Sequence, residues 1–293
     1  TVINGHNIIN THKPEVTEVS GTKTWDDANN QDGKRPESIT VNLLANGEKI
    51  DSKTVTAKDK WKYSFTDLPK YKEGQEIEYT ITEEAVAGYE TAVNGHNITN
   101  THKPEVTKVS GTKTWDDADD QDGKRPESIT VNLMADGEKI DSKTVTAADK
   151  WTYSFTNLPK YKEGKEVEYT LTEQAVKEYK TTINGFNITN THKPEKIDIS
   201  GTKTWNDNEN QDGKRPESIT VNLLANEEKV DSVTVKPDDE GNWKYTFKDL
   251  DKYAGGEEIK YTVIEEPVPG YNATVDKENF DITNNYVLGS ILV

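Results

Sequence analysis

Cysteine is absent from this 293-residue chain, and methionine occurs only once. Without cysteine the fold has no disulfide bonds and no thiolate metal site. This absence fits a cytosolic protein, and it fits equally well a surface protein that is stabilised by another kind of bond.

Basic residues are outnumbered by acidic ones, 36 against 53, and long apolar runs are absent. The formal net charge is −17 at pH 7, which argues against nucleic acid or an anionic membrane surface as a partner. Hydrophobic residues make up 31% of the chain, too few for one large core but enough for several small β domains. The sequence has no apolar run of membrane-spanning length and no recognisable signal peptide. It starts in mid-pattern with TVINGHNIINTHKPEV and ends on the apolar VLGSILV, so we expect a fragment of a longer protein.

What the sequence does contain is internal repetition. The stretch GTKTW occurs three times, and its lysines at 23, 113 and 203 are spaced by 90 residues (113 − 23 and 203 − 113). The stretch QDGKRPESITVNL recurs in step with it, starting at Gln31, Gln121 and Gln211. A period of this length suits an independent domain rather than a solenoid unit.

Within each copy the apolar residues alternate with polar ones, which indicates strands. Trp61, Tyr63 and Phe65 alternate with polar residues, and turn pairs such as Asn46-Gly47 separate the runs. About seven strands are expected in the first copy, near residues 19–25, 38–46, 49–57, 61–67, 77–84, 89–94 and 97–102. Such a pattern predicts an all-β chain of three tandem Ig-like β-sandwich domains.

The repeats suggest where the domains begin and end. We expect the closing strand and linker of a preceding repeat at 1–16, repeats at 17–103, 104–194 and 195–287, and a C-terminal tail at 288–293. The junctions at Pro14, Pro104 and Pro194 are short and lack glycine or serine runs. Linkers of this kind are semi-rigid, which predicts an elongated rod of domains.

Three polar residues in each copy fall on strand faces that the alternation assigns to the core. Lys23 precedes Trp25 by two residues, and Glu83 and Asn100 each follow an inward-facing isoleucine by two residues. Burying an unpaired ammonium or carboxylate is costly, and desolvation lowers the pKa of a lysine and raises that of a glutamate. The corresponding triples in the other copies are Lys113, Glu173, Asn190 and Lys203, Glu265, Asn284.

These three residue types together suggest a reaction. If a proton passes from the lysine to the glutamate, a neutral and nucleophilic amine is left beside a carboxylic acid. The acid can hydrogen-bond the asparagine carboxamide and shuttle protons as ammonia leaves, while contact distance supplies a high effective molarity. The pattern therefore predicts an isopeptide bond between lysine Nζ and asparagine Cγ. A buried ion triad without any bond stays open as the alternative. The neighbouring Glu84 is a weaker candidate for the acid. The alternation places its side chain toward solvent, and the second copy has Gln174 at this position.

The copies resemble the Cna protein B-type (CnaB) repeat domains of Gram-positive surface adhesins and pilins, such as the B region of staphylococcal-type collagen adhesins. The matching features are the K-x-W strand, the DGKRP segment, the W-x-Y-x-F strand, the Y-T-[IVL]-x-E glutamate and the I-T-N asparagine, over residues 17–287. The resemblance implies reverse-Ig sandwiches with intramolecular bonds formed autocatalytically with help from the glutamate. By position these bonds are Lys23–Asn100 with Glu83, Lys113–Asn190 with Glu173, and Lys203–Asn284 with Glu265.

The same resemblance implies the role of the whole protein. The repeats would form the stalk of an extracellular, cell-wall-anchored adhesin that carries a head domain for a host matrix or cell-surface ligand. Attachment to peptidoglycan would use a sorting signal, and this chain contains neither a head domain nor an LPXTG signal. We expect a monomer without cofactor, metal or membrane insertion, and no turnover enzyme, because each site consumes its own lysine once. Direct binding of matrix protein by the repeats and a place in a pilus shaft are the alternatives.

Two other features invite a functional interpretation. The acidic stretch at 26–37 looks calcium-like, but the EF-hand register would place Ala28 as its first ligand, so a solvated loop is expected. Asp27, Asp32 and Asp212 are the carboxylates to inspect there. The histidines are expected on the linker surface rather than in a shared mechanism, because Tyr286 replaces one of them in the third copy; they are His6, His12, His96, His102 and His192.

Overall fold

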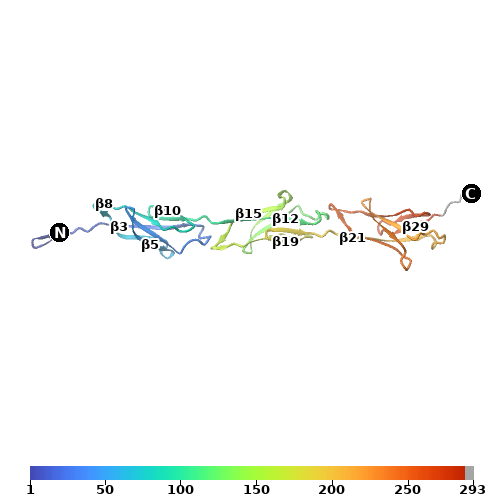
Figure 1. Cartoon of the computed structure of the whole chain (residues 1–293), viewed down its shortest axis with the longest axis horizontal. Coiled ribbons are helices and arrows are strands. Elements are labelled where there is room, and N and C mark those ends of the chain that lie inside the picture. The colour runs from blue at the N-terminus through green and yellow to red at the C-terminus, as the bar shows by residue number, and fades with distance from the viewer. Residues whose placement is uncertain (288–293) are drawn as a thin grey trace. The chain divides into compact units, whose positions relative to one another are not determined.

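Each of the three repeats is an Ig-like sandwich of two β-sheets. The computed structural model describes residues 1–287, so the tail expected at 288–293 lies outside the described residues. The first repeat, drawn in blue and cyan, shows the two packed sheets in Figure 1. One sheet has the strand order β10-β11-β3-β6 and the other has the order β5-β4-β9. The predicted all-β fold class is confirmed.

The strands of the first repeat agree closely with the seven expected from the alternation. They are β3 (Val16–Asp26), β4 (Ser38–Ala45), β5 (Glu48–Thr56), β6 (Lys62–Pro69), β9 (Tyr79–Glu83), β10 (Glu90–Asn94) and β11 (Asn97–Thr101). The sequence interpretation did not include a short hairpin of two two-residue strands, β7 (Tyr71–Lys72) and β8 (Gln75–Glu76). It also did not include the 3₁₀ turn η1 (Ala57–Asp59). A separate hairpin, β1 (Val2–Asn4) and β2 (Asn7–Ile9), precedes the repeat where a closing strand was expected.

The other two repeats have the same sheet orders. The second contains β12 (Val106–Asp116), β13 (Ser128–Ala135), β14 (Glu138–Thr146), η2 (Ala147–Asp149), β15 (Thr152–Pro159), β16 (Tyr161–Lys162), β17 (Lys165–Glu166), β18 (Tyr169–Glu173), β19 (Lys180–Asn184) and β20 (Asn187–Thr191). The third contains β21 (Lys196–Asn206), β22 (Ile219–Ala225), β23 (Glu228–Val235), β24 (Trp243–Asp251), β25 (Tyr253–Ala254), β26 (Glu257–Glu258), β27 (Tyr261–Glu265), β28 (Tyr271–Val275) and β29 (Ile282–Tyr286).

The core of the first repeat lies between its two sheets. Val41, Leu43 and Ile98 have no exposed surface, and Phe65 is 2% exposed. These residues come from β4, β11 and β6, so both sheets contribute inward-facing side chains. Residues with period two on a strand share one face, which is why the sequence pattern places the core correctly.

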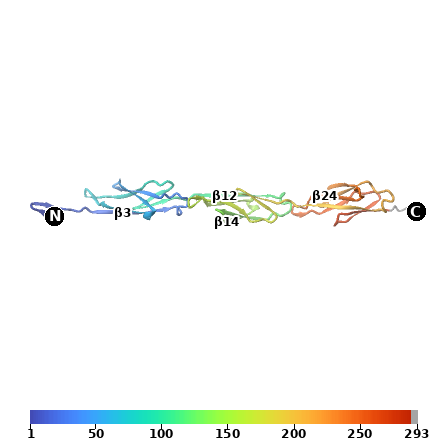
Figure 2. The same cartoon turned by 90° about the horizontal axis from the view of Figure 1, so that it is seen from below.

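The first and last strands of each repeat lie side by side and run parallel. In the first repeat Ile98 of β11 is opposite Lys23 of β3, and Asn100 is opposite Trp25. Figure 2 shows β3, which carries Lys23, in the first repeat. Because side chains two residues apart point to the same face, this register directs Lys23 and Asn100 toward the same interior. The same parallel pairing joins β12 to β20 and β21 to β29.

A glycine allows β3 to lie this close to the turn before β11. A Cβ atom at Gly21 would collide with the carbonyl oxygen of His96 and lie 2.6 Å from the Tyr63 hydroxyl. That hydroxyl donates a hydrogen bond to the same carbonyl oxygen. Gly111 and Gly201 meet equivalent carbonyls, of Phe186 and Phe280. The GTKTW glycine is therefore a packing requirement of the sandwich.

We predict that Gly21→Ala destabilises the first repeat by about 1–3 kcal/mol or more, because the added methyl group has no space. Hydrogen exchange of the full chain, resolved by peptide, should show faster exchange in residues 17–103 and unchanged exchange in the third repeat. Ser20→Ala, at the exposed neighbouring position, is the matched control. Equal protection in the two variants would contradict the steric argument.

Candidate functional site

The structure brings the three predicted polar residues of each repeat together inside the sandwich. Lys23 lies on β3, Asn100 on the adjacent β11, and Glu83 on β9 of the facing sheet. The side chains of Lys23 and Glu83 are 0% exposed, and Asn100 is 0% exposed as a residue. The other two lysines, Lys113 and Lys203, are each 4% exposed, and Asn190 and Asn284 are fully buried.

Strand periodicity and an aromatic cover explain this burial. Along β3, Val19 and Lys23 are buried, whereas Thr24 between Lys23 and Trp25 is exposed. The Lys23 ammonium lies 4.1 Å from the centre of the Trp25 ring, within cation–π range. The corresponding distances from Lys113 to Trp115 and from Lys203 to Trp205 are 3.5 Å and 3.9 Å. The K-x-W pattern thus places an aromatic face against each amine.

The amine and the carboxyl group are close to each other. Lys23 Nζ is 3.3 Å from Glu83 Oε1, and Lys203 Nζ is 3.9 Å from Glu265 Oε1. Lys203 Nζ also donates a hydrogen bond of 3.0 Å to the carbonyl oxygen of Thr204. Lys113 does the same to Thr114, at 3.0 Å. Lys23 and Lys203 are therefore held within reach of an acid, and the charge of Glu173 acts on Lys113.

Burial lowers the pKa of all three lysines from 10.5 to about 8. Desolvation is the largest cause, and the nearby glutamate opposes it by favouring the charged amine. At pH 7 a pKa of about 8 leaves roughly a tenth of such amines neutral, compared with a few in ten thousand for an ordinary lysine. Burial also raises the pKa of Glu265, partly offset by the Lys203 charge and the Asn284 carboxamide. A neutral amine beside a neutral acid is thus an accessible state.

The buried polar atoms are poorly satisfied. Among the described residues, neither the oxygen nor the nitrogen of the Asn100, Asn190 and Asn284 carboxamides has a hydrogen-bond partner. Within residues 1–287 the same holds for Lys23 Nζ and for Oε1 of Glu83, Glu173 and Glu265. Each such group costs about 1–3 kcal/mol, so their recurrence at one place in three repeats calls for a functional explanation.

The acidic loop forms a second buried cluster, so the expectation of a solvated loop was wrong for Asp27. This residue is 2% exposed and accepts two hydrogen bonds from Arg35, at 2.6 Å and 3.0 Å. The Tyr89 hydroxyl and the Asn30 backbone N–H complete its partners. Hydrogen bonds to Arg35, Asn30 and Tyr89 lower the pKa of Asp27 although burial opposes them. The other repeats have the same cluster at Asp117–Arg125–Tyr179 and Asp207–Arg215–Tyr271.

Sequence reasoning missed Arg35 and Tyr89 as members of this cluster. The arginine was visible in the recurring DGKRP segment, and a tyrosine stands at the matching place of every copy. Recurrence of these residues was the available signal.

The expected surface position was wrong for His102 and His192, whereas His6 and His12 are exposed as expected. The side chain of His102 is only 10% exposed, and its Nε2 lies 2.8 Å from Oδ2 of Asp32, which is itself buried. The same Asp32 oxygen accepts a hydrogen bond from the Glu105 backbone N–H. His192 and Asp122 repeat the pair at 2.9 Å. These residues fix the segment after the last strand rather than lie on the linker surface. Asp212, the third carboxylate to inspect, is exposed.

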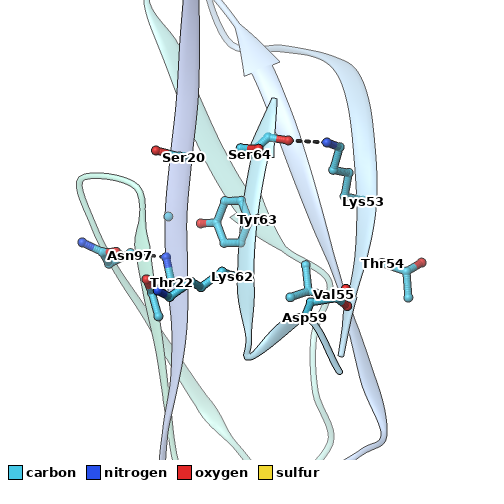
Figure 3. Close-up of a pocket in the computed structure, with 11 residues that line it drawn as sticks. Ser20, Thr22, Lys53, Thr54, Val55, Asp59, Lys62, Tyr63, Ser64 and Asn97 are labelled. Atoms are coloured by element: carbon cyan, nitrogen blue, oxygen red, sulfur yellow. Dashed lines mark hydrogen bonds between the residues drawn. The ribbon is translucent and has the colours of Figure 1, made fainter. Parts of the chain in front are cut away.

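A surface groove of about 690 Å³ in the first repeat is the other concave feature of interest. Figure 3 shows it between β5 and β6, with Lys53, Val55 and Tyr63 among its lining residues. The Lys53 ammonium donates a hydrogen bond to the carbonyl oxygen of Ser64 and lies 5.1 Å from the Phe65 ring. The groove residues do not include the lysine–glutamate–asparagine triad, whose buried position makes it the better candidate site.

Two kinds of feature are absent from the described residues. Residues 1–287 contain no group of three or more histidine, aspartate or glutamate side chains placed to hold a metal ion. They also contain no helix that is long and apolar enough to cross a membrane.

Comparison with known proteins gives consistent matches. The Cna protein B-type domain family matches residues 19–101, 109–191 and 199–285. A collagen adhesin of Staphylococcus aureus is 49% identical over 295 aligned positions, which cover 98% of this chain and only 24% of that relative. The crystal structure of two B repeat units of the collagen-binding protein Cna of S. aureus is 47% identical, with a TM-score of 0.55, over 93% of this chain and 74% of that one. A single B repeat unit of the same protein is 45% identical, with a TM-score of 0.30, over 61% of this chain and all of that one.

We predict that Arg35→Gln destabilises the first repeat by about 3 kcal/mol, the lower end for a broken buried pair because Arg35 is 24% exposed. Since the pKa of Asp27 is lowered on folding, the contribution of Asp27 is present above its ordinary value of 3.8 and lost as pH falls below it. Denaturant unfolding of Arg35→Gln and of the control Lys34→Gln, at neutral and at acidic pH, measures the free energy of unfolding. Lys34→Gln removes an exposed pair with Glu105 and should change nothing measurable. Equal effects of the two substitutions at neutral pH would contradict the assignment.

Proposed function

Because the chain belongs to the Cna protein B-type domain family, we propose that each repeat cross-links itself through an isopeptide bond between its buried lysine and asparagine. The observation that carries this proposal is the buried triad of amine, carboxyl and carboxamide, with orphaned polar atoms, in all three repeats. The pairs are Lys23–Asn100, Lys113–Asn190 and Lys203–Asn284, and the acids are Glu83, Glu173 and Glu265.

The reaction is a transamidation that needs no outside reagent. The neutral lysine amine attacks the asparagine Cγ, while the protonated glutamate hydrogen-bonds the carboxamide oxygen as negative charge develops there. The Cγ–Nδ2 bond then breaks as a proton from the amine reaches the leaving nitrogen by way of the glutamate. One lysine amine and one carboxamide become one secondary amide and one ammonia molecule. The glutamate ends in its starting protonation state.

The product removes the difficulty that the buried groups create. An amine that prefers water is replaced by an amide, which is uncharged and has a single N–H. That N–H can donate to the glutamate that is already present. Forming the bond therefore replaces a poorly solvated ionisable pair by a group that a protein interior tolerates.

The bond would also stabilise the fold. It closes a loop of 77 residues between Lys23 and Asn100 (100 − 23), which on the chain-entropy model contributes roughly 4–5 kcal/mol. Pulled straight, that loop would release roughly 250 Å of chain at about 3.3 Å per residue. Because the bond joins neighbouring first and last strands, a cross-linked repeat withholds nearly all of this length under tension. Resistance to proteases follows for the same reason.

For the parent protein we propose a stalk. The chain spans 24% of the S. aureus relative, which is named a collagen adhesin. Cross-linked repeats would project a ligand-binding head domain from the peptidoglycan of a Gram-positive cell, outside the cell. The host ligand would contact the head domain rather than the repeats. Each site consumes its lysine once, so the reaction is autocatalytic and not an enzymatic turnover.

Direct binding of matrix protein by the repeats is the second candidate, since the name of the S. aureus relative refers to collagen. Three near-copies would then contribute avidity. Solid-phase binding of this chain to collagen and other matrix proteins separates the two proposals. Saturable binding by the repeats alone would favour the second candidate, and no binding would favour the stalk.

We predict that the intact mass is lower than the sequence mass by three ammonia molecules, as measured by mass spectrometry of the whole chain. Glu83→Ala should restore the mass of one ammonia, because the first repeat loses its acid. Glu84→Ala is the matched control, since this neighbour is 59% exposed and its ion pair is with the surface residue Lys49. An unshifted wild-type mass would refute the cross-links, and an unchanged loss in Glu83→Ala would assign the acid elsewhere.

The pH dependence of cross-linking should have a plateau. The reactive neutral pair holds one proton, the same number as the ammonium–carboxylate pair, so the rate is level while the pair keeps that proton. Above about pH 8, the pKa of the buried lysines, the pair loses the proton and the rate should fall. It should also fall in acid, where both groups are protonated. The chain can be purified unfolded, refolded by dilution at each pH and quenched with acid for mass analysis. A rate that keeps climbing above pH 8 would contradict the shared-proton mechanism.

A further inference from the structure

The catalytic glutamate has a hydroxyl partner in two repeats and lacks it in the third. Thr91 Oγ1 donates a hydrogen bond of 3.0 Å to Glu83 Oε2, and Thr181 Oγ1 donates one of 2.7 Å to Glu173 Oε2. Both threonines lie directly opposite the reactive asparagine in the sheet. In the third repeat the residue opposite Asn284 is Ala273, which has no hydroxyl.

This difference leaves the third carboxyl group without a hydroxyl donor. In the first two repeats, among the described residues, only Oε1 of the glutamate is without a hydrogen-bond partner. For Glu265 of the third repeat, neither carboxyl oxygen has one within the described part of the chain. The threonine therefore marks a difference in how the acid is held.

We propose that Thr91 and Thr181 are positioning residues for cross-linking, and that the third repeat cross-links more slowly because Ala273 replaces them. This inference rests on the proposed isopeptide function. The hydroxyl hydrogen bond uses one lone pair of Oε2 and stabilises negative charge there, which favours Oε1 as the oxygen that takes the proton from the lysine. That oxygen is the one that faces the lysine amine. The hydroxyl thus selects one of two protonation sites and fixes the rotation of the carboxyl group.

The step itself is unchanged by the threonine. The Lys23 ammonium gives a proton to Glu83 Oε1, and the neutral amine then forms the Nζ–Cγ bond. A second proton from that nitrogen reaches Nδ2 by way of the glutamate as the Cγ–Nδ2 bond breaks and ammonia leaves. The threonine keeps its own proton throughout and touches neither the nucleophile nor the bond that breaks. Without it the proton can reside on either oxygen, and only some rotations of the carboxyl group are productive. Removing the threonine therefore slows the reaction because fewer orientations of the carboxyl group are productive.

The hydroxyl should also change the pH profile, which a purely structural contact would not. A hydrogen bond donated to a carboxylate favours its charged form, so removing the donor raises the pKa of the acid. In the third repeat, where the donor is absent, burial already raises the pKa of Glu265. The acidic edge of the rate plateau should therefore lie at higher pH when the threonine is missing.

The test compares three substitutions in the full chain. Thr91→Val removes the hydroxyl and keeps the side-chain shape, Thr91→Ser keeps the hydroxyl, and Ala273→Thr adds one to the third repeat. Each chain is refolded from denaturant, quenched in acid at intervals and digested, and the cross-linked peptides of each repeat are counted by mass spectrometry. The untouched second repeat serves as an internal standard in every sample.

We expect Thr91→Val to slow the first repeat roughly three- to tenfold, the size of effect that one hydrogen bond produces, and to move its acidic edge to higher pH. Thr91→Ser should restore both, and Ala273→Thr should accelerate the third repeat and lower its acidic edge. Hydrogen exchange checks that the variants fold.

Two failures can be told apart. If all three repeats lose ammonia but Thr91→Val and Ala273→Thr leave rates and pH profiles unchanged, the positioning role is overturned and the cross-links stand. If the wild-type chain loses no ammonia in any repeat, the proposed function itself fails. If Thr91→Val does not fold, the Ala273→Thr result decides: an unchanged third repeat overturns the inference.

Discussion

Removing an amine from water is the constraint on which the rest of each repeat depends. The buried lysines have a pKa of about 8 although a glutamate lies beside them, so desolvation outweighs the attraction of the partner. Every neighbouring element maintains this condition. The tryptophan two residues later covers the amine, the parallel last strand brings the carboxamide, and the facing sheet brings the acid. Opening any of these contacts to solvent would raise the pKa of the lysine toward its ordinary value of 10.5 and make the neutral amine rarer.

The three repeats share this centre but differ around it. Asp27 and its two counterparts are held by an arginine and a tyrosine in every copy, so the loop after the first strand has the same anchor throughout. Beside the glutamate they differ at one strand position, which is Thr91 in the first repeat, Thr181 in the second and Ala273 in the third. A shared lysine–glutamate–asparagine triad with a different neighbour beside the glutamate is what one expects if the repeats form the same bond at different rates.

Much of the fold and of the candidate site could be predicted from period two alone. The alternation predicted that the side chains of Lys23, Glu83 and Asn100 point inward, because successive side chains of a strand point to opposite faces of the sheet. The acidic loop has no such periodicity. Ala28 and the two asparagines after it all adopt positive φ values, between 48° and 62°, a conformation that alanine rarely takes. Asp27 holds that loop through its hydrogen bonds to Asn30 and Arg35, and these contacts exist only in the folded chain.

The pairing of each first strand with the last strand of its own copy also bears on how such genes change. Every repeat completes its hydrogen-bonded sheets without borrowing a strand from another copy. An in-frame duplication or deletion of one whole unit therefore adds or removes a finished domain and leaves the others intact. Each such change lengthens or shortens the protein by one repeat and leaves the buried lysine, glutamate and asparagine of every other domain in place.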